Sequence, residues 1–263
     1  MPVRLAAIDL DGTLLRSDGT ISARTKAAVR AAAAAGIETV LVTARGPRTV
    51  GDIAAELEVR GEAICSNGAI VLDLATREIV RLREIETAVA LELVHGLRER
   101  LPGILFAVER ERFAHEPGFA AWNFVPPATT PVGPAEELLA EPPTKLILRH
   151  EGHELETIAA LARELAGHRA SVSVSGEWVV EVSPAGVNKA SALAELCEEA
   201  GVPPEEVVAF GDHLNDLPML TWVGLGVAVA NAHPEVIDLA DELTASNDED
   251  GVALVLERLA SAA

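Results

Sequence analysis

The chain has 263 residues, 49% of them hydrophobic, and its 41 acidic and 21 basic residues give a formal net charge of −20. This charge argues against a nucleic acid partner, which needs a basic face, and against an anionic membrane surface. No apolar stretch has transmembrane length, and the N-terminus lacks a basic region followed by an apolar one, so we expect a soluble, cytoplasmic protein. Cys65 and Cys197 stand in apolar contexts and are interpreted as buried free thiols.

The first 83 residues alternate between apolar runs that predict strands and segments that predict helices. The expected strands are 3–8, 38–42 and 63–65, the expected helices are 23–35 and 47–57, and a hairpin is expected over 69–82. This alternation favours right-handed βαβ crossovers and a parallel sheet. Ligands of such sheets bind beyond the carboxyl ends of the strands, where Asp9, Thr43 and Asn67 fall.

From residue 84 the pattern changes, and we predict an inserted, smaller α/β domain over residues 84–183. Its expected helices are 86–100 and 154–166, and its expected strands are 104–109, 144–149, 169–174 and 178–182. The stretch 110–143 has many prolines and little periodicity. A structureless insert of this length would be improbable, so a second domain is favoured over a long loop.

The core pattern returns over residues 184–263. It consists of a helix over 186–200, a strand at 207–210, a short helix to Leu220, a strand at 225–229 and a helix at 251–260. With residues 1–83 these elements predict a doubly wound, Rossmann-like parallel sheet. Asp212 directly follows one of the strands and should therefore lie at the same sheet edge as Asp9.

Two carboxylates, Asp9 and Asp11, end the first strand in the run Ile-Asp-Leu-Asp-Gly-Thr-Leu-Leu. Burying a charge without a partner is very costly, and the usual partners of two close carboxylates are a hard cation or a proton. Gly12 allows the backbone to turn immediately afterwards. The alternative is a strand that ends in an Asp-Gly turn with solvated charges.

The run Asp-Leu-Asp-Gly-Thr-Leu at 9–14 resembles the first motif of the haloacid dehalogenase-like superfamily, whose members include aspartyl-phosphate phosphatases. Three further motifs follow in the family's order, namely Thr-Ala-Arg at 43–45, Gly-Val-Asn-Lys at 186–189 and Gly-Asp-x-x-Asn-Asp at 211–216. The insert resembles the type IIB, or Cof-type, cap, which implies a domain that closes over the site and selects the leaving group. Ala44 departs from the glycine that the family usually has there, and its methyl group disfavours positive φ.

The resemblance implies that Asp9 is the nucleophile and that Asp11 is the general acid and base. It implies a Mg²⁺ cofactor held by Asp9, the backbone carbonyl of Asp11, and Asp212, with Asp216 as their support. Such a cation would offset the long-range repulsion between this acidic chain and a phosphate ester. The residues expected to bind the phosphate are Thr43, Ala44, Lys189 and Asn215.

Contacts with the leaving group are expected from a further set of residues, Arg45, Asn67, Gly68 and Glu181. His115, Trp122 and Lys145 are additional candidates within the inserted domain. A tryptophan or histidine in such a domain is more often a packing residue than a ligand contact.

These features predict a Mg²⁺-dependent phosphatase of small phosphorylated metabolites, with sugar or polyol phosphates as the expected substrates. One alternative is a phosphomutase, which returns the phosphoryl group to a sugar instead of to water. Another is a non-catalytic protein that binds phosphorylated ligands. We expect a monomer or a small homo-oligomer.

Overall fold

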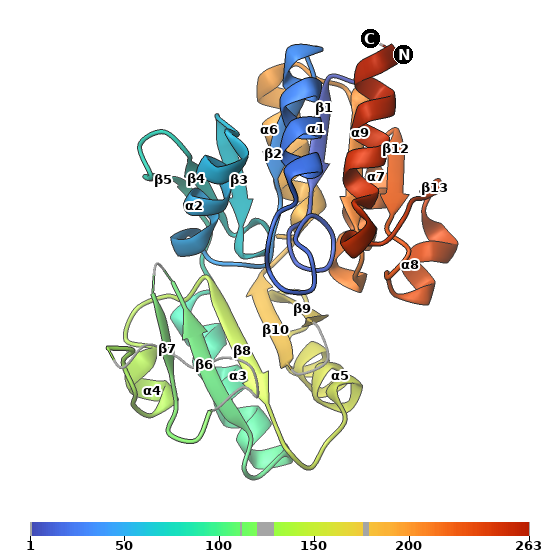
Figure 1. The fold of residues 1–263 in the computed structure, drawn as a ribbon. Coiled ribbons are helices and arrows are strands. Elements are labelled where there is room, and N and C mark those ends of the chain that lie inside the picture. The colour runs from blue at the N-terminus through green and yellow to red at the C-terminus, as the bar shows by residue number, and fades with distance from the viewer. Residues whose placement is uncertain (1, 111, 120–128, 176–178, 263) are drawn as a thin grey trace. The chain divides into compact units, whose positions relative to one another are not determined.

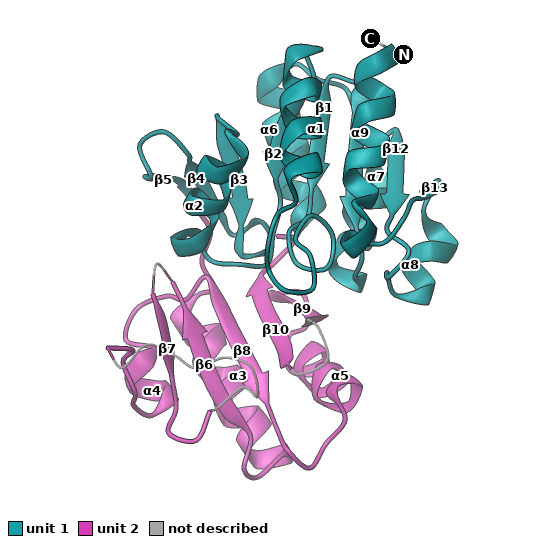
Figure 2. Ribbon diagram, viewed as in Figure 1, with its two compact units in different colours: residues 1–81, 188–263 teal, residues 82–187 magenta. Residues whose placement is uncertain are grey.

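The computed structural model describes residues 2–110, 112–119, 129–175 and 179–262. The chain forms two compact units (Figure 2), of which unit 1 comprises residues 1–81 and 188–263 and unit 2 comprises residues 82–187. The domain boundaries predicted from the sequence, after residues 83 and 183, lie two and four residues from this division.

Unit 1 is built on a five-stranded parallel sheet with the strand order β13-β12-β11-β1-β2. The strands are β1 (Leu5–Ile8), β2 (Glu38–Leu41), β11 (Val207–Gly211), β12 (Leu225–Ala228) and β13 (Glu242–Leu243). In the central register Ile8 lies opposite Phe210 on one side and Leu41 on the other. The segments that follow β1, β2 and β11 therefore leave the sheet at the same edge.

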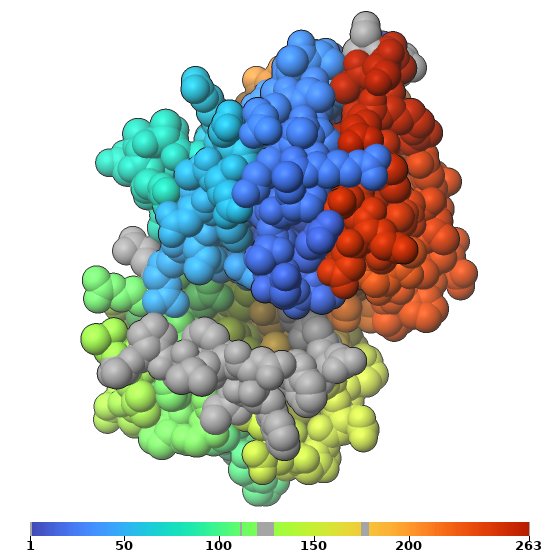
Figure 3. Space-filling model, viewed as in Figure 1, coloured from blue at the N-terminus to red at the C-terminus, as the bar shows by residue number. Residues whose placement is uncertain are grey.

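Helices cover both faces of this sheet (Figure 1). The helices α1 (Ala23–Ala34) and α9 (Gly251–Ala262) lie side by side on the face nearer the viewer, where Figure 3 shows α1 in blue and α9 in red in contact. On the far face lie α6 (Lys189–Ala200) and α7 (Leu217–Trp222). The predicted fold class, a doubly wound α/β core, is confirmed.

Local sequence signals set the ends of these helices. The Ser22 hydroxyl accepts a hydrogen bond from the Thr25 N–H at the start of α1, and Pro47 occupies the first turn of α2 (Pro47–Leu57). At the start of α6, Asn188 and Ser191 form a reciprocal capping box. The capping box fixes where α6 begins, and hence the position of Lys189 on its first turn.

Next to β2 the chain forms a separate three-stranded sheet from β3 (Glu62–Cys65), β4 (Ile70–Asp73) and β5 (Ile79–Leu82). The predicted hairpin corresponds to β4 and β5. Only one parallel bridge, Val42 to Ile64, is described between β3 and the main sheet, and the Thr43 N–H donates to the Ile64 carbonyl at 2.8 Å. These contacts are enough to bring the carboxyl end of β3 beside that of β2.

Unit 2 contains an antiparallel five-stranded sheet in the order β7-β6-β8-β10-β9, with α3 and α5 contributing to the same apolar core. Its elements are α3 (Thr87–Arg100), β6 (Leu105–Glu109), β7 (Phe113–His115), α4 (Ala135–Leu138), β8 (Lys145–Arg149), α5 (Leu155–Ala166), β9 (Ala170–Ser175) and β10 (Val179–Pro184). Where the structure describes the stretch 110–143, which has no clear periodicity, it contains one short strand and one short helix. Both are too short to show a repeating pattern in the sequence.

Two further elements of unit 1 were not predicted, α8 (Pro234–Leu239) and β13. Each spans six residues or fewer, so neither contains two full repeats of its period. Within the described part of the chain, no helix combines the length and the apolar character that crossing a bilayer requires.

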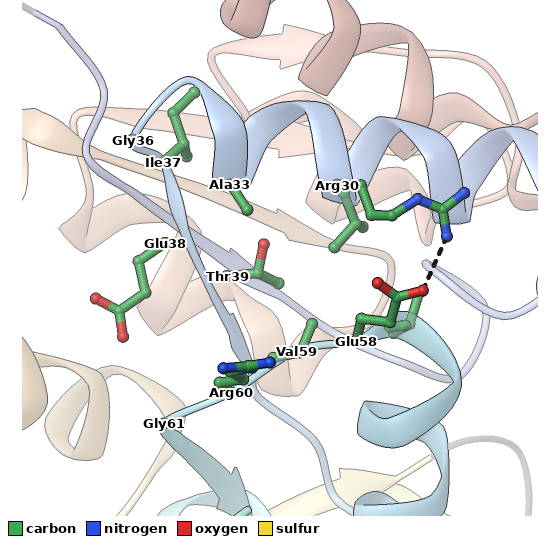
Figure 4. Close-up of a pocket in the computed structure, with 12 residues that line it drawn as sticks. Arg30, Ala33, Gly36, Ile37, Glu38, Thr39, Glu58, Val59, Arg60 and Gly61 are labelled. Atoms are coloured by element: carbon green, nitrogen blue, oxygen red, sulfur yellow. Dashed lines mark hydrogen bonds and ion pairs between the residues drawn. The ribbon is translucent and has the colours of Figure 1, made fainter.

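A pocket of about 680 Å³ lies in unit 1 at the amino-terminal ends of β2 and β3 (Figure 4). Ala33 and Ile37 contribute apolar surface, and an ion pair of 3.3 Å joins Arg30 to Glu58 at its rim. The residues predicted to be functional follow the opposite, carboxyl ends of the strands. The pocket is therefore separate from the candidate site.

Replacement of Ser22 by alanine removes the side-chain acceptor at the start of α1, and we expect it to lower the free energy of unfolding by about 1 kcal/mol. In thermal unfolding this corresponds to a decrease in Tm of roughly 2–4 °C. Ser261→Ala, at the exposed end of α9, is the control and should leave Tm unchanged. Equal Tm values for Ser22→Ala and wild type would contradict the assignment of the cap.

Candidate active site

The predicted residues of unit 1 lie at the carboxyl edge of the parallel sheet. Asp9 follows β1, Asp212 follows β11, and Thr43 lies two residues beyond β2. Asp9 and Thr43 are buried, with exposed fractions of 4% and 0%. Buried polar groups need hydrogen-bond or ion-pair partners, so the contacts of these side chains indicate the chemistry that the site supports.

Three carboxylates form a cluster at this edge. One oxygen from each of Asp9, Asp212 and Asp216 lies within 4.8 Å of the other two. Segments more than 200 residues apart in the sequence supply these groups, and parallel pairing of β1 with β11 brings them together. The Asp11 side chain lies outside this cluster, so its carbonyl remains the predicted contribution of Asp11 to a metal site.

Lys189 supplies the positive charge inside the cluster. Its Nζ atom lies 2.6 Å from Asp9 Oδ1 and 2.5 Å from Asp216 Oδ1, and only 1% of the side chain is exposed. Burial alone would lower the pKa of Lys189, but Asp216 and Asp9 raise it well above its ordinary value. The lysine is therefore charged, and it has one further proton to donate.

Asp216 orients the segment that carries Asp212. Its Oδ2 atom accepts hydrogen bonds of 3.0 Å from the backbone N–H groups of Asp212 and His213, while Oδ1 binds Lys189. A side chain at Gly211 would place its Cβ 2.5 Å from the Cβ of Asp216, so this strand end requires glycine. These contacts favour a supporting role for Asp216 over direct metal ligation.

The other two carboxylates have raised pKa values. Burial, followed by the charge of Asp216, raises the pKa of Asp212 to about 6, although the Thr13 hydroxyl donates to its Oδ1 at 2.9 Å. Burial also raises the pKa of Asp9 well above its usual range, against the opposing effect of Lys189. In both cases burial disfavours the ionised carboxylate, and the charge of Lys189 does not fully offset this effect.

The donor set fits a hard divalent cation. Asp9, Asp212 and Asp216 carry three negative charges when ionised and Lys189 carries one positive charge, which leaves an excess of two negative charges in a largely buried place. All the available ligand atoms are oxygens, as Mg²⁺ prefers. A divalent cation would remove the excess charge and would lower the pKa values of Asp9 and Asp212, because it favours their ionised forms.

Gly12 adopts a φ of +79°, which places it in the left-handed region. A Cβ atom built there would lie 2.4 Å from Asp212 Oδ2. The glycine thus permits both the turn after Asp11 and the close approach of the loop to the Asp212 carboxylate.

Arg45 binds both oxygens of Asp11, with Nε to Oδ2 at 2.7 Å and Nη2 to Oδ1 at 2.6 Å. Its backbone N–H donates to the Thr43 hydroxyl at 3.1 Å, which leaves that hydroxyl able to donate its own proton. Ala44 has a negative φ, so its methyl group does not oppose this turn. The departure from the family's usual glycine is therefore compatible with the observed backbone.

The turn at Ser66–Gly68 lies against the start of α6. Asn67 is in the left-handed region, and its side-chain oxygen accepts a hydrogen bond of 3.1 Å from Asn215. At Gly68 a Cβ would lie 2.5 Å from the Asn188 carbonyl, immediately before Lys189. Asn67, Gly68 and Asn215 therefore lie beside the segment that carries the lysine, and their predicted ligand contacts stay predictions.

In unit 2 the two charged candidates bind each other. Lys145 on β8 lies 2.9 Å from Glu181 on β10 and 3.5 Å from Glu109, and its side chain is 1% exposed. His115 is buried, with its Nδ1 atom 2.8 Å from the Glu116 carbonyl. Trp122 lies outside the described residues. The role of Glu181 in substrate binding likewise stays a prediction.

Three residues near the site were missed from the sequence. The Thr13 hydroxyl binds Asp212, and the side-chain amides of Asn231 and Asn247 bind backbone carbonyls of the loop after β1. A signal for Asn231 was available, because it lies three residues beyond the end of β12. Asn247 does not follow a strand long enough to be predicted, so its position in the sequence gave no indication of a role near the site.

Comparison with known proteins identifies related sequences over almost the whole chain. A sequence model of haloacid dehalogenase-like hydrolases matches residues 6–256. A putative phosphatase of Haemophilus influenzae is 34% identical over 252 residues, covering 95% of each chain. The 5-amino-6-(5-phospho-D-ribitylamino)uracil phosphatase YitU of Bacillus subtilis is 31% identical over 266 residues, covering 96% of each. A haloacid dehalogenase-like hydrolase from Bacteroides thetaiotaomicron superposes with a TM-score of 0.80 at 27% identity, covering 98% of this chain and 99% of the other.

The raised pKa of Asp212 predicts a pH-dependent stability in the absence of metal. Because the folded-state pKa, about 6, exceeds the ordinary value of 3.8, ionisation destabilises the fold and stability falls as the pH rises through this window. We expect Asp212→Asn to be more stable than wild type in EDTA by up to about 3 kcal/mol at pH 7, and by less at pH 5.

Urea unfolding of both proteins at pH 5, 6 and 7 measures this difference. Added Mg²⁺ should stabilise the wild type at pH 7 and reduce the difference. Parallel pH profiles of the two proteins in EDTA would show that Asp212 titrates normally.

Proposed function

The chain belongs to the haloacid dehalogenase-like hydrolase family and is a phosphatase, and we propose that it hydrolyses small sugar or polyol phosphates in a Mg²⁺-dependent reaction through an aspartyl-phosphate on Asp9. The observation that carries this proposal is the cluster of Asp9, Asp212 and Asp216 around Lys189. All the described groups that the reaction needs lie in unit 1.

Asp9 and Asp212, with the Asp11 carbonyl, would hold Mg²⁺, and Asp216 would keep Asp212 in place through the backbone. When bound, the cation offsets the repulsion between the carboxylates and the phosphate and stabilises charge on the phosphoryl oxygens. The two described cations nearest Asp9 are already paired, since Lys189 is shared with Asp216 and Arg45 binds Asp11.

In the first step an Asp9 carboxylate oxygen attacks phosphorus. An O–P bond forms to Asp9 while the bond from phosphorus to the ester oxygen breaks. For this step Asp11 must leave its ion pair with Arg45 and carry a proton, which it transfers to the departing oxygen. In the second step water attacks phosphorus, Asp11 takes the proton from this water, and Asp9 is released together with inorganic phosphate.

Lys189 and Thr43 suit the binding of the phosphoryl oxygens during both steps. Lys189 keeps one proton after binding Asp9 and Asp216, and the Thr43 hydroxyl keeps its proton after accepting from Arg45. Both side chains are buried and held by other contacts, so little entropy is lost when they bind the phosphate.

The proposed substrate class rests on a relative. The name of the YitU phosphatase, 31% identical to this chain, describes a substrate whose phosphate is carried on a ribityl group, a polyol. An alcohol leaving group of this kind needs a proton, which accords with a carboxylate at Asp11 two residues after the nucleophile.

Asp9→Asn should abolish phosphate release, because the amide cannot attack phosphorus, and we expect kcat to fall by at least about 10³-fold. The measurement is phosphate release across a panel of phosphorylated metabolites, with Tm as the check on folding. The control Asp52→Asn changes an exposed aspartate paired with Arg77 and should keep wild-type activity.

Retained phosphate release by Asp9→Asn would refute the nucleophile assignment. Net isomerisation of a hexose phosphate without phosphate release would show a phosphomutase instead. Wild-type protein whose Tm rises with phosphorylated ligands but which turns none of them over would show a binding protein.

Removal of divalent cations with EDTA should abolish turnover, and Mg²⁺ should restore it, because the excess negative charge would otherwise repel the phosphate. Asp212→Asn should need a higher Mg²⁺ concentration for half-maximal activity, by about 10-fold or more. Activity that is unchanged after exhaustive EDTA treatment would contradict the proposed cofactor.

A further inference from the structure

Two asparagines from the C-terminal part of unit 1 bind the loop that carries Asp11. The Asn231 Nδ2 atom donates to the Gly12 carbonyl at 2.7 Å, and the Asn247 Nδ2 atom donates to the Leu15 carbonyl at 2.9 Å. The Asn247 backbone N–H donates to Asn231 Oδ1 at 2.9 Å, which ties the Asn231 side chain to the backbone of Asn247. We refer to Asn231 and Asn247 as the asparagine pair.

The carbonyl bound by Asn231 belongs to a residue with little freedom. Gly12 is in the left-handed region and has no room for a side chain beside Asp212. Fixing its carbonyl fixes the plane of the peptide that follows, because that peptide is rigid. Thr13 begins at this peptide, and its hydroxyl donates to Asp212. Asp11 directly precedes Gly12, so the same contact limits the backbone that carries Asp11.

We propose that the asparagine pair positions the loop after β1 so that Asp11 can protonate the leaving group, which makes Asn231 and Asn247 positioning residues for the first step. This inference rests on the proposed phosphatase reaction. Asn231 holds the Gly12 carbonyl, which is next to Asp11, and Asn247 holds the Leu15 carbonyl farther along the loop.

A purely structural role fits Asn231 less well than a positioning role. Its side chain is exposed, and its two hydrogen bonds, to the Gly12 carbonyl and from the Asn247 N–H, each contribute only modestly to stability. A displacement of about 1 Å in a reacting group can nevertheless reduce a rate by about 10²-fold. Loss of the Asn231 side chain should therefore affect proton transfer more than folding.

The leaving group distinguishes the two roles. Glycerol phosphate releases an alkoxide that needs a proton, whereas p-nitrophenyl phosphate releases a stable phenolate that does not. For Asn231→Ala we expect the single-turnover rate of phosphoryl transfer to fall about 10- to 100-fold with glycerol phosphate, a part of the contribution that general acids make. With p-nitrophenyl phosphate we expect a fall of less than about 3-fold, because the acid contributes little there.

Single-turnover rates are needed because the second step, attack of water, is the same for both substrates. The control is Ser17→Ala, which removes a 2.7 Å hydrogen bond between the same loop and Asp248 but lies beyond the carbonyls that the asparagine pair binds. It should leave both rates unchanged. Asn247→Ala is the second variant, and its Tm is measured because Asn247 is buried.

Equal losses with both substrates for Asn231→Ala would overturn the proposal, as would unchanged rates. If wild-type protein cleaves neither substrate nor any metabolite in the panel, the proposed function fails. The geometric part is then tested by hydrogen exchange, in which the amides of residues 12–17 should exchange faster in Asn231→Ala. Unchanged exchange would overturn the positioning role independently of activity.

Discussion

The buried ammonium group of Lys189, held between Asp9 and Asp216, is the interaction on which the site depends. A lysine is costly to bury, and it stays charged here because two carboxylates lie within 2.6 Å of its Nζ atom. The lysine in turn partly neutralises those carboxylates. Since Asp212 adds a third negative charge, the balance is incomplete without a further cation. In the proposed reaction the groups that leave this charge unbalanced would also hold the cation and the phosphate.

Sheet topology makes this arrangement possible. β1 lies between β11 and β2, so the loops that follow these three strands start side by side. Lys189 reaches them from the first turn of α6, whose start is fixed by its own capping box and by the close approach of Gly68 to Asn188. Asp9, which we propose as the nucleophile, and Lys189, Asp212 and Asp216 thus come from rigid elements or their immediate ends, which favours a preorganised site.

The sequence predicted the parts of this site that depend on position along a strand. Asp9 and Asp212 follow apolar runs, and a parallel sheet brings such positions together wherever they occur in the chain. It also predicted the fold class, because the alternation of strands and helices extends over most of the core. Contacts between segments that are distant in the chain could not be predicted from the sequence. The contacts of Arg45 with Asp11 and of Asn231 with Gly12 join residues 34 and 219 positions apart, and no local pattern marks them. Within unit 2, β7 and α4 were not predicted, because elements of three or four residues are too short to show a hydrophobic repeat in the sequence.

Gly12 meets two separate requirements because its side chain is a single hydrogen atom. The backbone there has a positive φ, and no room exists for a Cβ atom beside Asp212. An L-amino acid with a side chain would be strained by this torsion and would also clash with the Asp212 carboxylate. The two requirements could be separated by chemical ligation. A D-alanine would accept the torsion and direct its methyl group to the other side of the α-carbon, away from the position that an L-side chain would occupy. Such a semisynthetic protein would reveal whether mirror-image stereochemistry alone explains why this position excludes substitution.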